Sequence, residues 1–350
     1  MSKLTISRAV TPEEKAIGKK EQFTRLIGGG WIFILLILLI AIFSFLRPEY
    51  FGSRYNLSQL TINAAILLVL SVGQTWVIIA AGIDLSVGAV LVFSSVVSAQ
   101  VMLALAGASG STFGTTDAGW GIIAIGSGVA VFAGAMWGLV NGFLVAVARI
   151  PALIVTLGTF GMALGLAQIF SGGVDVRAMP EKLVDGLGSG NLAGVPMLVV
   201  VAIVVVLVAA FVLHLTRFGL HSFALGSNLE ALRRAGINVR SRLIAIYMIS
   251  GALAGIAAVM SNARFSTTTI SGHAMDNLGT ISAVVLGGTS LFGGIGSVAG
   301  TVIGVFIPII LLNGFVILGI PPFWQTVAMG AVLILAVWID QLKRRARQRG

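Results

Sequence analysis

Few side chains in this 350-residue sequence have the type and spacing that catalysis or metal binding requires. The chain has no Cys, which excludes a thiolate nucleophile, a disulfide framework and a Cys-based metal site. Its three histidines, His214, His221 and His273, lie near the ends of different apolar runs, without the H-E-x-x-H spacing of a zinc site. No G-x-S-x-G nucleophile motif and no G-x-x-x-x-G-K-[ST] phosphate loop occurs. We therefore predict no catalytic residue, no bound metal and no ATP site in this chain.

Ionisable side chains inside the apolar runs are equally sparse. A carrier driven by protons or cations needs buried Asp, Glu, His or Arg, because such groups are costly in hydrocarbon and are kept there for a task. Asp84 is the only carboxylate near a junction of two apolar runs that is not in an evidently polar loop, and Asp340 ends the last run. We therefore expect no ion relay, and an energy source outside this chain.

Two glycine-rich breaks interrupt the apolar pattern, GIDLSVG at 82–88 and GGTSLFGG at 287–294. Two interpretations of the first break remain open. Asp84 caps the amides of the following helix, or the break is a gate or hinge beside a solute path. The second break has the same ambiguity. The gate or path candidates in the two breaks are Gly82, Asp84, Ser86, Gly88, Gly288, Thr289 and Ser290.

Other polar residues are embedded within the apolar runs themselves. Hydrogen bonding between helices is the commoner use of such residues in a membrane, and lining of a weakly polar passage is the alternative. The path candidates of this kind are Asn63, Gln74, Thr75, Asn141, Thr159 and Gln168.

A polar, Arg-rich island, LGSNLEALRRAGINVRSR, separates two long apolar runs. Ser227 followed by Glu230 is the pattern of a capping box, in which each side chain bonds the other residue's backbone amide. Leu229 and Leu232 then share one face of a helix of about two turns, and Gly236 is a natural C-terminal stop. Such a helix is either an ordinary interfacial helix or a docking element for a cytoplasmic partner.

Composition indicates that these motifs are embedded in a membrane. With 57% hydrophobic residues and 10% charged residues, the chain lacks the polar surface to cover a water-soluble body of its size. A membrane helix needs about 20 apolar residues, and runs such as WIFILLILLIAIF lack the alternation of a β-barrel. We predict an all-α polytopic membrane protein with about ten transmembrane helices. The predicted spans are 29–46, 57–81, 85–106, 121–148, 152–172, 196–215, 243–263, 278–292, 297–318 and 323–340.

Lys and Arg set the predicted orientation, because positively charged short loops stay on the cytoplasmic side. With both termini inside, 17 of the 22 basic residues fall in inside segments. We predict a cytoplasmic tail at 1–28, a transmembrane domain at 29–340 with an inside loop at 216–242, and a basic cytoplasmic tail at 341–350. This placement accounts for the net charge of +10 through topology and contact with anionic membrane lipid, so we expect no nucleic acid partner.

Small residues and a weak internal repeat point to a tightly packed bundle. Two stretches, 139–162 and 311–334, share N-G-F followed about eight residues later by Pro and another apolar span, a possible inverted-topology repeat. Small-xxx-small pairs allow close approach of helix backbones, although some are expected by chance in a chain with 45 glycines. These pairs are Gly134/Gly138, Gly138/Gly142, Gly161/Gly165, Gly251/Gly255 and Gly300/Gly304.

Three motifs occur in a characteristic order and spacing: AGIDLSVGAVL at 81–91, ALGSNLEALRRAGINV at 224–239 and ISAVVLGGTSLFGGIGSVAGTVIG at 281–304. Together they closely resemble the permease subunits of ribose-type sugar ABC importers. These belong to carbohydrate uptake class 2, within the branched-chain-amino-acid-permease-like superfamily. The similarity extends from about residue 55 to residue 340.

The resemblance implies that the polar island is the coupling helix, which docks on an ATP-binding subunit. Its residues are Ser227, Asn228, Leu229, Glu230, Ala231, Leu232, Arg233, Arg234, Ala235 and Gly236. The resemblance also implies a bacterial plasma (inner) membrane complex with ATP-binding cassette ATPase subunits, a second permease subunit that is alike or related, and a sugar-binding protein. ATP and Mg would bind to the ATPase and not to this chain.

Within that complex, the chain is expected to form the path for a monosaccharide by alternating access. An importer fed by a binding protein needs little affinity of its own, so a strong sugar pocket is not predicted. The alternatives are an ABC permease for another small polar solute, such as a branched-chain amino acid or a nucleoside, and a self-sufficient carrier or channel.

Overall fold

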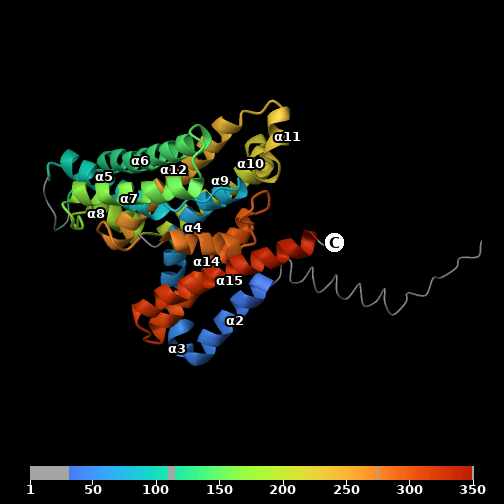
Figure 1. Ribbon diagram of the computed structural model, residues 1–350. Coiled ribbons are helices and arrows are strands. Elements are labelled where there is room, and N and C mark those ends of the chain that lie inside the picture. Colours follow the sequence, from blue (N-terminus) through green and yellow to red (C-terminus); the bar gives the residue numbers. More distant parts are fainter. Residues whose placement is uncertain (1–30, 109–113, 115, 274–275, 349–350) are drawn as a thin grey trace, which may run out of the picture.

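The computed structural model describes residues 31–108, 114, 116–273 and 276–348, so the predicted N-terminal tail lies outside the described residues. The described chain is helical apart from short loops and one small hairpin (Figure 1). Its elements are α2 (Trp31–Leu46), α3 (Pro48–Phe51), α4 (Arg54–Ile79), α5 (Val87–Leu105), α6 (Trp120–Ala146), α7 (Ala152–Ser171), α8 (Glu181–Leu183), the π-helical turn η1 (Val184–Gly188), β1 (Asn191–Leu192), β2 (Val195–Pro196), α9 (Met197–Leu215), α10 (Arg217–Ser227), α11 (Leu229–Arg234), α12 (Val239–Phe265), α13 (Asp276–Leu286), α14 (Val298–Ile317) and α15 (Pro322–Gln348).

Within the described residues, eight helices are long and apolar enough to cross a membrane: α4, α5, α6, α7, α9, α12, α14 and α15. Two shorter apolar helices, α2 and α13, correspond to the first and eighth predicted spans. These helices confirm the prediction of an all-α polytopic membrane protein. The physical reason is that a continuous apolar run in lipid can pair its backbone amides and carbonyls within a helix. The exact number of spans and their orientation stay predictions.

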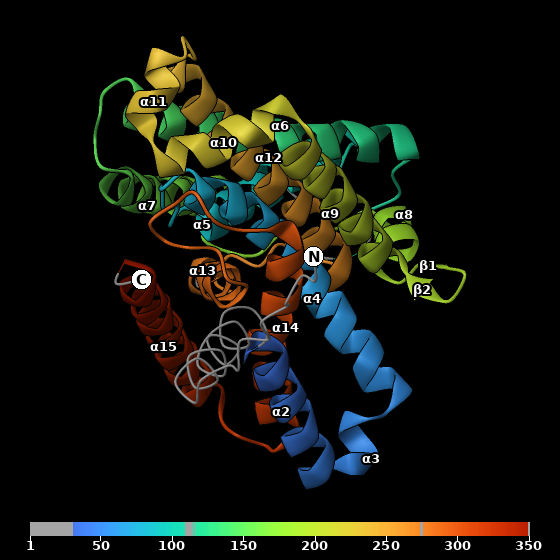
Figure 2. The same ribbon diagram turned by 90° about the vertical axis from the view of Figure 1, so that its right-hand side faces the viewer.

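Helix α4 forms the centre of the bundle. Its side chains are buried along most of its length, and it packs against α9, α12, α13 and α14 (Figures 1 and 2). By contrast, α9 and α15 expose most of their apolar side chains, which is the surface expected to face lipid or another membrane subunit.

Glycines bring α6 and α12 into direct backbone contact. Gly134 lies against Gly251, and Gly138 lies against the backbone of Tyr247, so an added Cβ at any of these glycines would collide with the facing main chain. The predicted small-xxx-small packing is therefore confirmed for this pair of helices. The absence of side chains here allows close van der Waals contact that larger residues would prevent.

The remaining small-residue pairs have different outcomes. Gly300 and Gly304 of α14 lie against the last turn of α13, with Gly304 facing Ala283. Gly161 and Gly165 of α7 face no atom within 4 Å, so this pair packs against nothing in the described part of the chain. The pattern alone could not separate these cases, because it does not say which face of a helix meets a neighbour.

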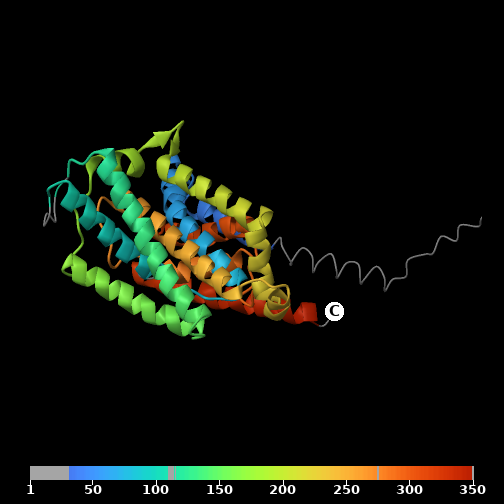
Figure 3. The same ribbon diagram turned by 90° about the horizontal axis from the view of Figure 1, so that it is seen from above.

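The bundle has two distinct ends. Helices α10 and α11 and the C-terminal end of α15 lie together at one end, and α8 lies at the other (Figures 1 and 3). We refer to these as the inner and outer ends. The positively charged segment 217–236, which contains α10 and α11, therefore shares an end with the basic C-terminal region, as the predicted orientation requires.

Some predicted boundaries were wrong. The eighth span was predicted to reach residue 292, but α13 stops at Leu286, where the glycine-rich break begins. The inside loop at 216–242 was predicted to hold one short helix, but it holds α10 as well as α11. By contrast, the last predicted span, 323–340, agrees with the apolar part of α15, Phe323–Gln341, and the helix continues into the predicted tail as far as Gln348.

Candidate functional site

The GIDLSVG break is a tight, buried turn between α4 and α5. Ala81 has a positive φ of 61°, and Gly82 packs so closely that an added Cβ would stand 2.7 Å from the hydroxyl oxygen of Tyr247. Only glycine fits at residue 82 without moving that tyrosine. The turn is thus held from both sides, by α4 and by α12.

A polar cluster fixes the break from within. The Asp84 carboxylate accepts hydrogen bonds from the Ser86 backbone amide at 2.8 Å and from the Ser86 hydroxyl at 2.6 Å, and Asn141 of α6 donates to that hydroxyl at 2.8 Å. In the amide orientation that gives it partners, the Gln74 side chain donates to the Asp84 main-chain carbonyl at 3.2 Å and accepts from the Asp84 main-chain amide at 3.3 Å. All four side chains are almost fully buried.

Side chains of two further helices donate hydrogen bonds to backbone carbonyls of the break. The Thr156 hydroxyl of α7 donates to the Ile83 carbonyl at 3.3 Å, and the Asn277 amide of α13 donates to the Leu85 carbonyl at 3.1 Å. Buried backbone groups left without partners would be costly. The break therefore connects α4 and α5 and is hydrogen-bonded to α6, α7 and α13. We expect a displacement of one of these helices to be transmitted to the others.

This geometry refines the sequence interpretation of Asp84. The carboxylate bonds the amide of Ser86, the residue before the first turn of α5, and does not reach the amides of the helix itself. It is 2% exposed, so in this conformation it is a buried brace of the turn. Its role as a gate beside the solute path stays a prediction.

The segment that was predicted to be the coupling helix consists of two short helices, α10 and α11, joined at a sharp bend. The predicted capping box at Ser227 and Glu230 was wrong. Asn228 is the N-cap of α11 and accepts from the Ala231 amide at 2.9 Å, while Ser227 closes α10 by donating to the Phe223 carbonyl at 2.9 Å. The chain extends at Asn228, with φ −155° and ψ 89°, so the cap falls one residue later.

The other end of α11 stops as predicted. Gly236 has φ +75°, its amide donates to the Arg233 carbonyl at 2.9 Å, and the Ile237 amide donates to the Leu232 carbonyl at 3.3 Å. These are the two hydrogen bonds of a Schellman motif. A six-residue helix is too short to be stable by propensity alone, so α11 depends on its two caps and on packing against the bundle.

One leucine anchors α11, and the rest of it is exposed. Leu232 is 5% exposed and packs into the main hydrophobic core, whereas Leu229 is 39% exposed. The two leucines were predicted to share one face of the helix, but only Leu232 is in the core and Leu229 is exposed. Exposed positions are Ser227, Asn228, Leu229, Glu230, Ala231, Arg233, Arg234, Ala235 and Gly236.

The three sequence motifs meet in space where α10 ends, because Gly293 of the third motif lies against Ala81 of the first and Gly226 of the second. The Gly294 amide donates to the Ile79 carbonyl at 2.8 Å, which joins the second glycine-rich break to the last turn of α4. Gly226 of α10 lies against the same Ile79 carbonyl and against the backbone of Gly293 and Gly294. None of these contacts has room for a Cβ. Sequence reasoning missed this junction, although each glycine lies in one of the three motifs.

The second break is also tied to the last helix. Asp340 of α15 accepts from the Ser290 hydroxyl and from the Leu291 amide, both at 3.3 Å. Thr289 is fully buried, and Gly288 is exposed with a positive φ of 87°. Loop 287–297 is thus a folded turn held by α4, α10 and α15.

The remaining path candidates lie apart from this junction. Thr159 donates to carbonyls of its own helix, and Gln168 is exposed. Thr75 lies within 2.6 Å of Thr301 of α14, hydroxyl to hydroxyl, and is fully buried. Asn63 lines a cavity near the outer end. Only Gln74, Asp84, Ser86 and Asn141 form one cluster.

Comparison with known proteins identifies the family of this chain. The model of the family described as "Branched-chain amino acid transport system / permease component" matches residues 56–337, which includes all three motifs. The chain belongs to this permease family. No solved structure matches the chain.

Curated relatives of this permease are similar over most of their length. It is 36% identical to the ribose import permease protein RbsC of Escherichia coli (strain K12), over 89% of this chain and 93% of that protein. It is 33% identical to the D-allose transport system permease protein AlsC of the same strain, over 89% and 90%. It is 31% identical to the galactose/methyl galactoside import permease protein MglC of that strain, over 94% and 98%.

Proposed function

We propose that this permease is the membrane-embedded subunit of an ATP-binding-cassette importer and forms the path for a monosaccharide. The observation that supports this most strongly is the 36% identity to a ribose import permease over 89% of the chain. The relatives named for allose and galactose point to the same class of solute.

The proposed partners follow from the family of this chain and from its lack of a phosphate loop. Its sequence has no phosphate loop, so ATP and Mg bind to a separate ATPase subunit that docks on α10 and α11. A sugar-binding protein delivers the solute to the outer end, and a second permease subunit, alike or related, completes the path. The complex resides in a bacterial inner membrane, with α11 in the cytoplasm.

The geometry suggests how closure of the ATPase moves the bundle. Leu229 and the arginines of α11 contact the partner, while Leu232 and both caps keep α11 rigid. Displacement of α10 passes through Gly226 to Ile79 and to loop 287–297 without an intervening flexible side chain. The GIDLSVG break at 82–88 then distributes the shift over five helices. A partner can shift such an equilibrium only by its differential affinity for the two shapes, which is why a stiff contact is needed.

Reconstitution tests this proposal. Proteoliposomes with the permease, its ATPase and its binding protein are expected to accumulate labelled ribose, allose or galactose only when ATP is supplied. Accumulation of a branched-chain amino acid or nucleoside instead would assign the permease to another solute. Uptake by the isolated chain without ATP would identify a self-sufficient carrier or channel and overturn the proposal.

A further inference from the structure

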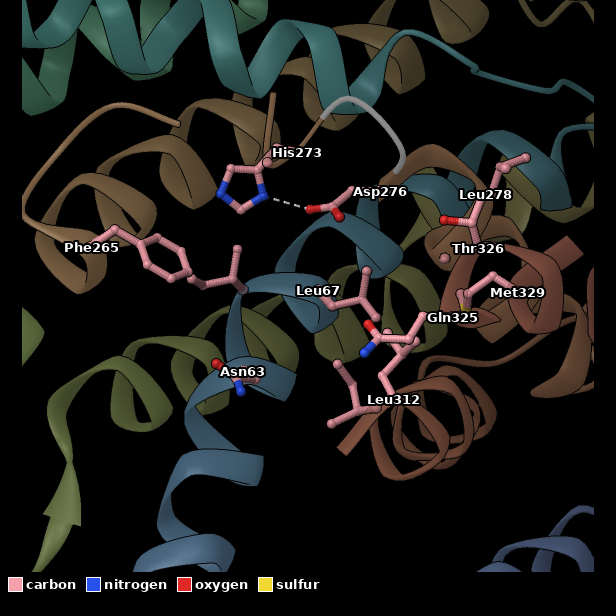
Figure 4. Close-up of a pocket in the computed structure, with 14 residues that line it drawn as sticks. Asn63, Leu67, Phe265, His273, Asp276, Leu278, Leu312, Gln325, Thr326 and Met329 are labelled. Carbon is pink, nitrogen blue, oxygen red and sulfur yellow. Dashed lines mark hydrogen bonds and ion pairs between the residues drawn. The ribbon is translucent and has the colours of Figure 1, made fainter. Parts of the chain in front are cut away.

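Figure 4 shows a cavity of about 430 Å³ whose lining includes no residue of α10 or α11. It is open on one side and is lined by residues of α4, α14 and α15, by the end of α12 at Phe265 and by the start of α13 at Asp276. A ring-sized solute fits a volume of this order, because small-molecule sites span about 300–1,000 Å³.

A chain of hydrogen bonds orients a carboxylate at the cavity wall. His273 Nδ1 lies 2.7 Å from Asp276 Oδ2, and His273 Nε2 lies 2.7 Å from the hydroxyl oxygen of Ser261. Ser261 is fully buried in α12, which fixes the imidazole, and the imidazole in turn fixes the carboxylate. The other oxygen of Asp276 has no hydrogen-bond partner among the residues that the structure describes.

Three more polar side chains line the same cavity from two helices. Asn63 of α4 and Thr326 of α15 are exposed and Gln325 of α15 is partly buried, and none of the three has a hydrogen-bond partner within the described part of the chain. Polar groups in the membrane part of a bundle ordinarily bond to one another. Here the Asp276 carboxylate and the two amides line an open cavity without bonding one another, which provides acceptors and donors for a ligand with several hydroxyl groups.

The rest of the wall is apolar and includes one aromatic ring. Phe265 stands beside the imidazole, with ring centroids 6.0 Å apart, and Leu67, Leu312 and Met329 close the other sides (Figure 4). A monosaccharide presents a hydroxyl edge and an apolar C–H face, and this lining offers a surface for each. A lipid acyl chain would match the apolar wall but leave the Asp276 carboxylate and the amides unpaired, which is costly in hydrocarbon.

We propose that this outer cavity is a low-affinity reception site for the monosaccharide, in which Asp276 accepts hydrogen bonds from sugar hydroxyls and His273 and Ser261 are positioning residues. The proposal rests on the proposed function, since it concerns the sugar that the complex imports. Low affinity agrees with delivery by a binding protein, because a tight site in the path would retain the solute.

The absence of Cys from the chain gives a direct test. Thr326→Cys places a single thiol on the cavity wall, and Asn191→Cys places a single exposed thiol in the outer hairpin as the matched control. The permease–ATPase complex in proteoliposomes is labelled from outside with a membrane-impermeant maleimide, without the binding protein, over a range of sugar concentrations. The sugar is whichever of ribose, allose and galactose the complete system takes up, and sorbitol controls for osmotic effects.

The proposal predicts that the imported sugar slows labelling at Thr326→Cys and leaves labelling at Asn191→Cys unchanged. Adding Asp276→Asn raises the half-protecting sugar concentration about tenfold, as expected for loss of a charge-assisted hydrogen bond. His273→Ala raises it in the same direction, and His273→Asn, which keeps a polar atom near the Nδ1 position, restores most of the protection. A role of His273 confined to folding predicts no such rescue.

The outcomes separate this inference from the proposed function. Intact sugar uptake without sugar protection at Thr326→Cys, or with protection that Asp276→Asn leaves unchanged, overturns the reception site and leaves the importer assignment standing. Equal protection by sorbitol also overturns it. If the complete system takes up none of the three sugars, the proposed function fails and this inference falls with it.

Discussion

The amide of Gly294 donates a 2.8 Å hydrogen bond to the carbonyl of Ile79, so the glycine-rich loop before α14 is joined directly to the last turn of α4. Gly226, at the end of α10, packs on the same carbonyl. Three segments separated by more than 60 residues along the sequence thus meet backbone to backbone at the inner end. Interiors packed this closely transmit displacement because they have little room to deform.

Substitution of Gly226 by Ala is expected to disrupt this junction. The added Cβ would collide with the Ile79 carbonyl and the Gly294 amide, and none of these main-chain atoms can move without breaking their hydrogen bond. We expect ATP-driven uptake to fall about tenfold, equivalent to about 1.4 kcal/mol of lost coupling. Gly128→Ala is the matched control, because Gly128 is also helical but has no atom within 4 Å of its Cβ position. Equal uptake in the two variants would contradict the proposed junction.

The position of the N-cap of α11 leads to a second prediction. Asn228→Ala removes the side chain that accepts from the Ala231 amide and should destabilise α11 by about 1 kcal/mol. Ser227→Ala should have little effect on α11, because the Ser227 hydroxyl bonds a carbonyl of α10. Amide hydrogen exchange over residues 229–236 measures the difference. Faster exchange in the serine variant than in the asparagine variant would restore the capping box that the sequence suggested.

The orientation can be tested by sided labelling. Arg234 has an exposed side chain on α11. The single thiol of an Arg234→Cys variant is expected to react with an impermeant maleimide only in inside-out membrane vesicles. A single Cys at Asn191, in the outer hairpin, is expected to react only in right-side-out vesicles. The reverse pattern would place α11 outside and remove the basis for a cytoplasmic ATPase partner.

Much of the bundle could be predicted from the sequence, because runs of about 20 apolar residues have few stable alternatives in lipid. Helix α10 was missed because its sequence, RFGLHSFALGS, mixes apolar, glycine and polar residues without a clear period. Its start depends on Thr216, which caps the Gly219 amide at 3.4 Å. A short helix of this kind is fixed by capping and by its neighbours more than by its own composition.

The candidate sites could be predicted only in part. Ser227 and Asn228 are both good N-cap residues, and the choice between them depends on where the backbone turns, which residue preferences do not determine. The outer cavity combines residues from 63 to 329, so no local pattern predicts it. One usable signal was overlooked: His273 and Asp276, three residues apart at the predicted start of a span, are an ionisable pair at the membrane edge.

In the proposed importer, a rigid α11 transmits the movement of the ATPase to the bundle. Gly236→Pro tests this most directly, because proline cannot adopt the positive φ of that residue or donate its amide to the Arg233 carbonyl. Glu230→Ala is the control, since it removes only exposed ion pairs with Arg233 and Arg234. The measurement is the number of sugar molecules taken up per ATP hydrolysed by the reconstituted complex. We predict that this ratio falls at least about tenfold in Gly236→Pro and stays normal in Glu230→Ala, with both proteins inserted normally. A normal ratio in Gly236→Pro would contradict the proposed role of α11 in coupling ATP hydrolysis to sugar uptake.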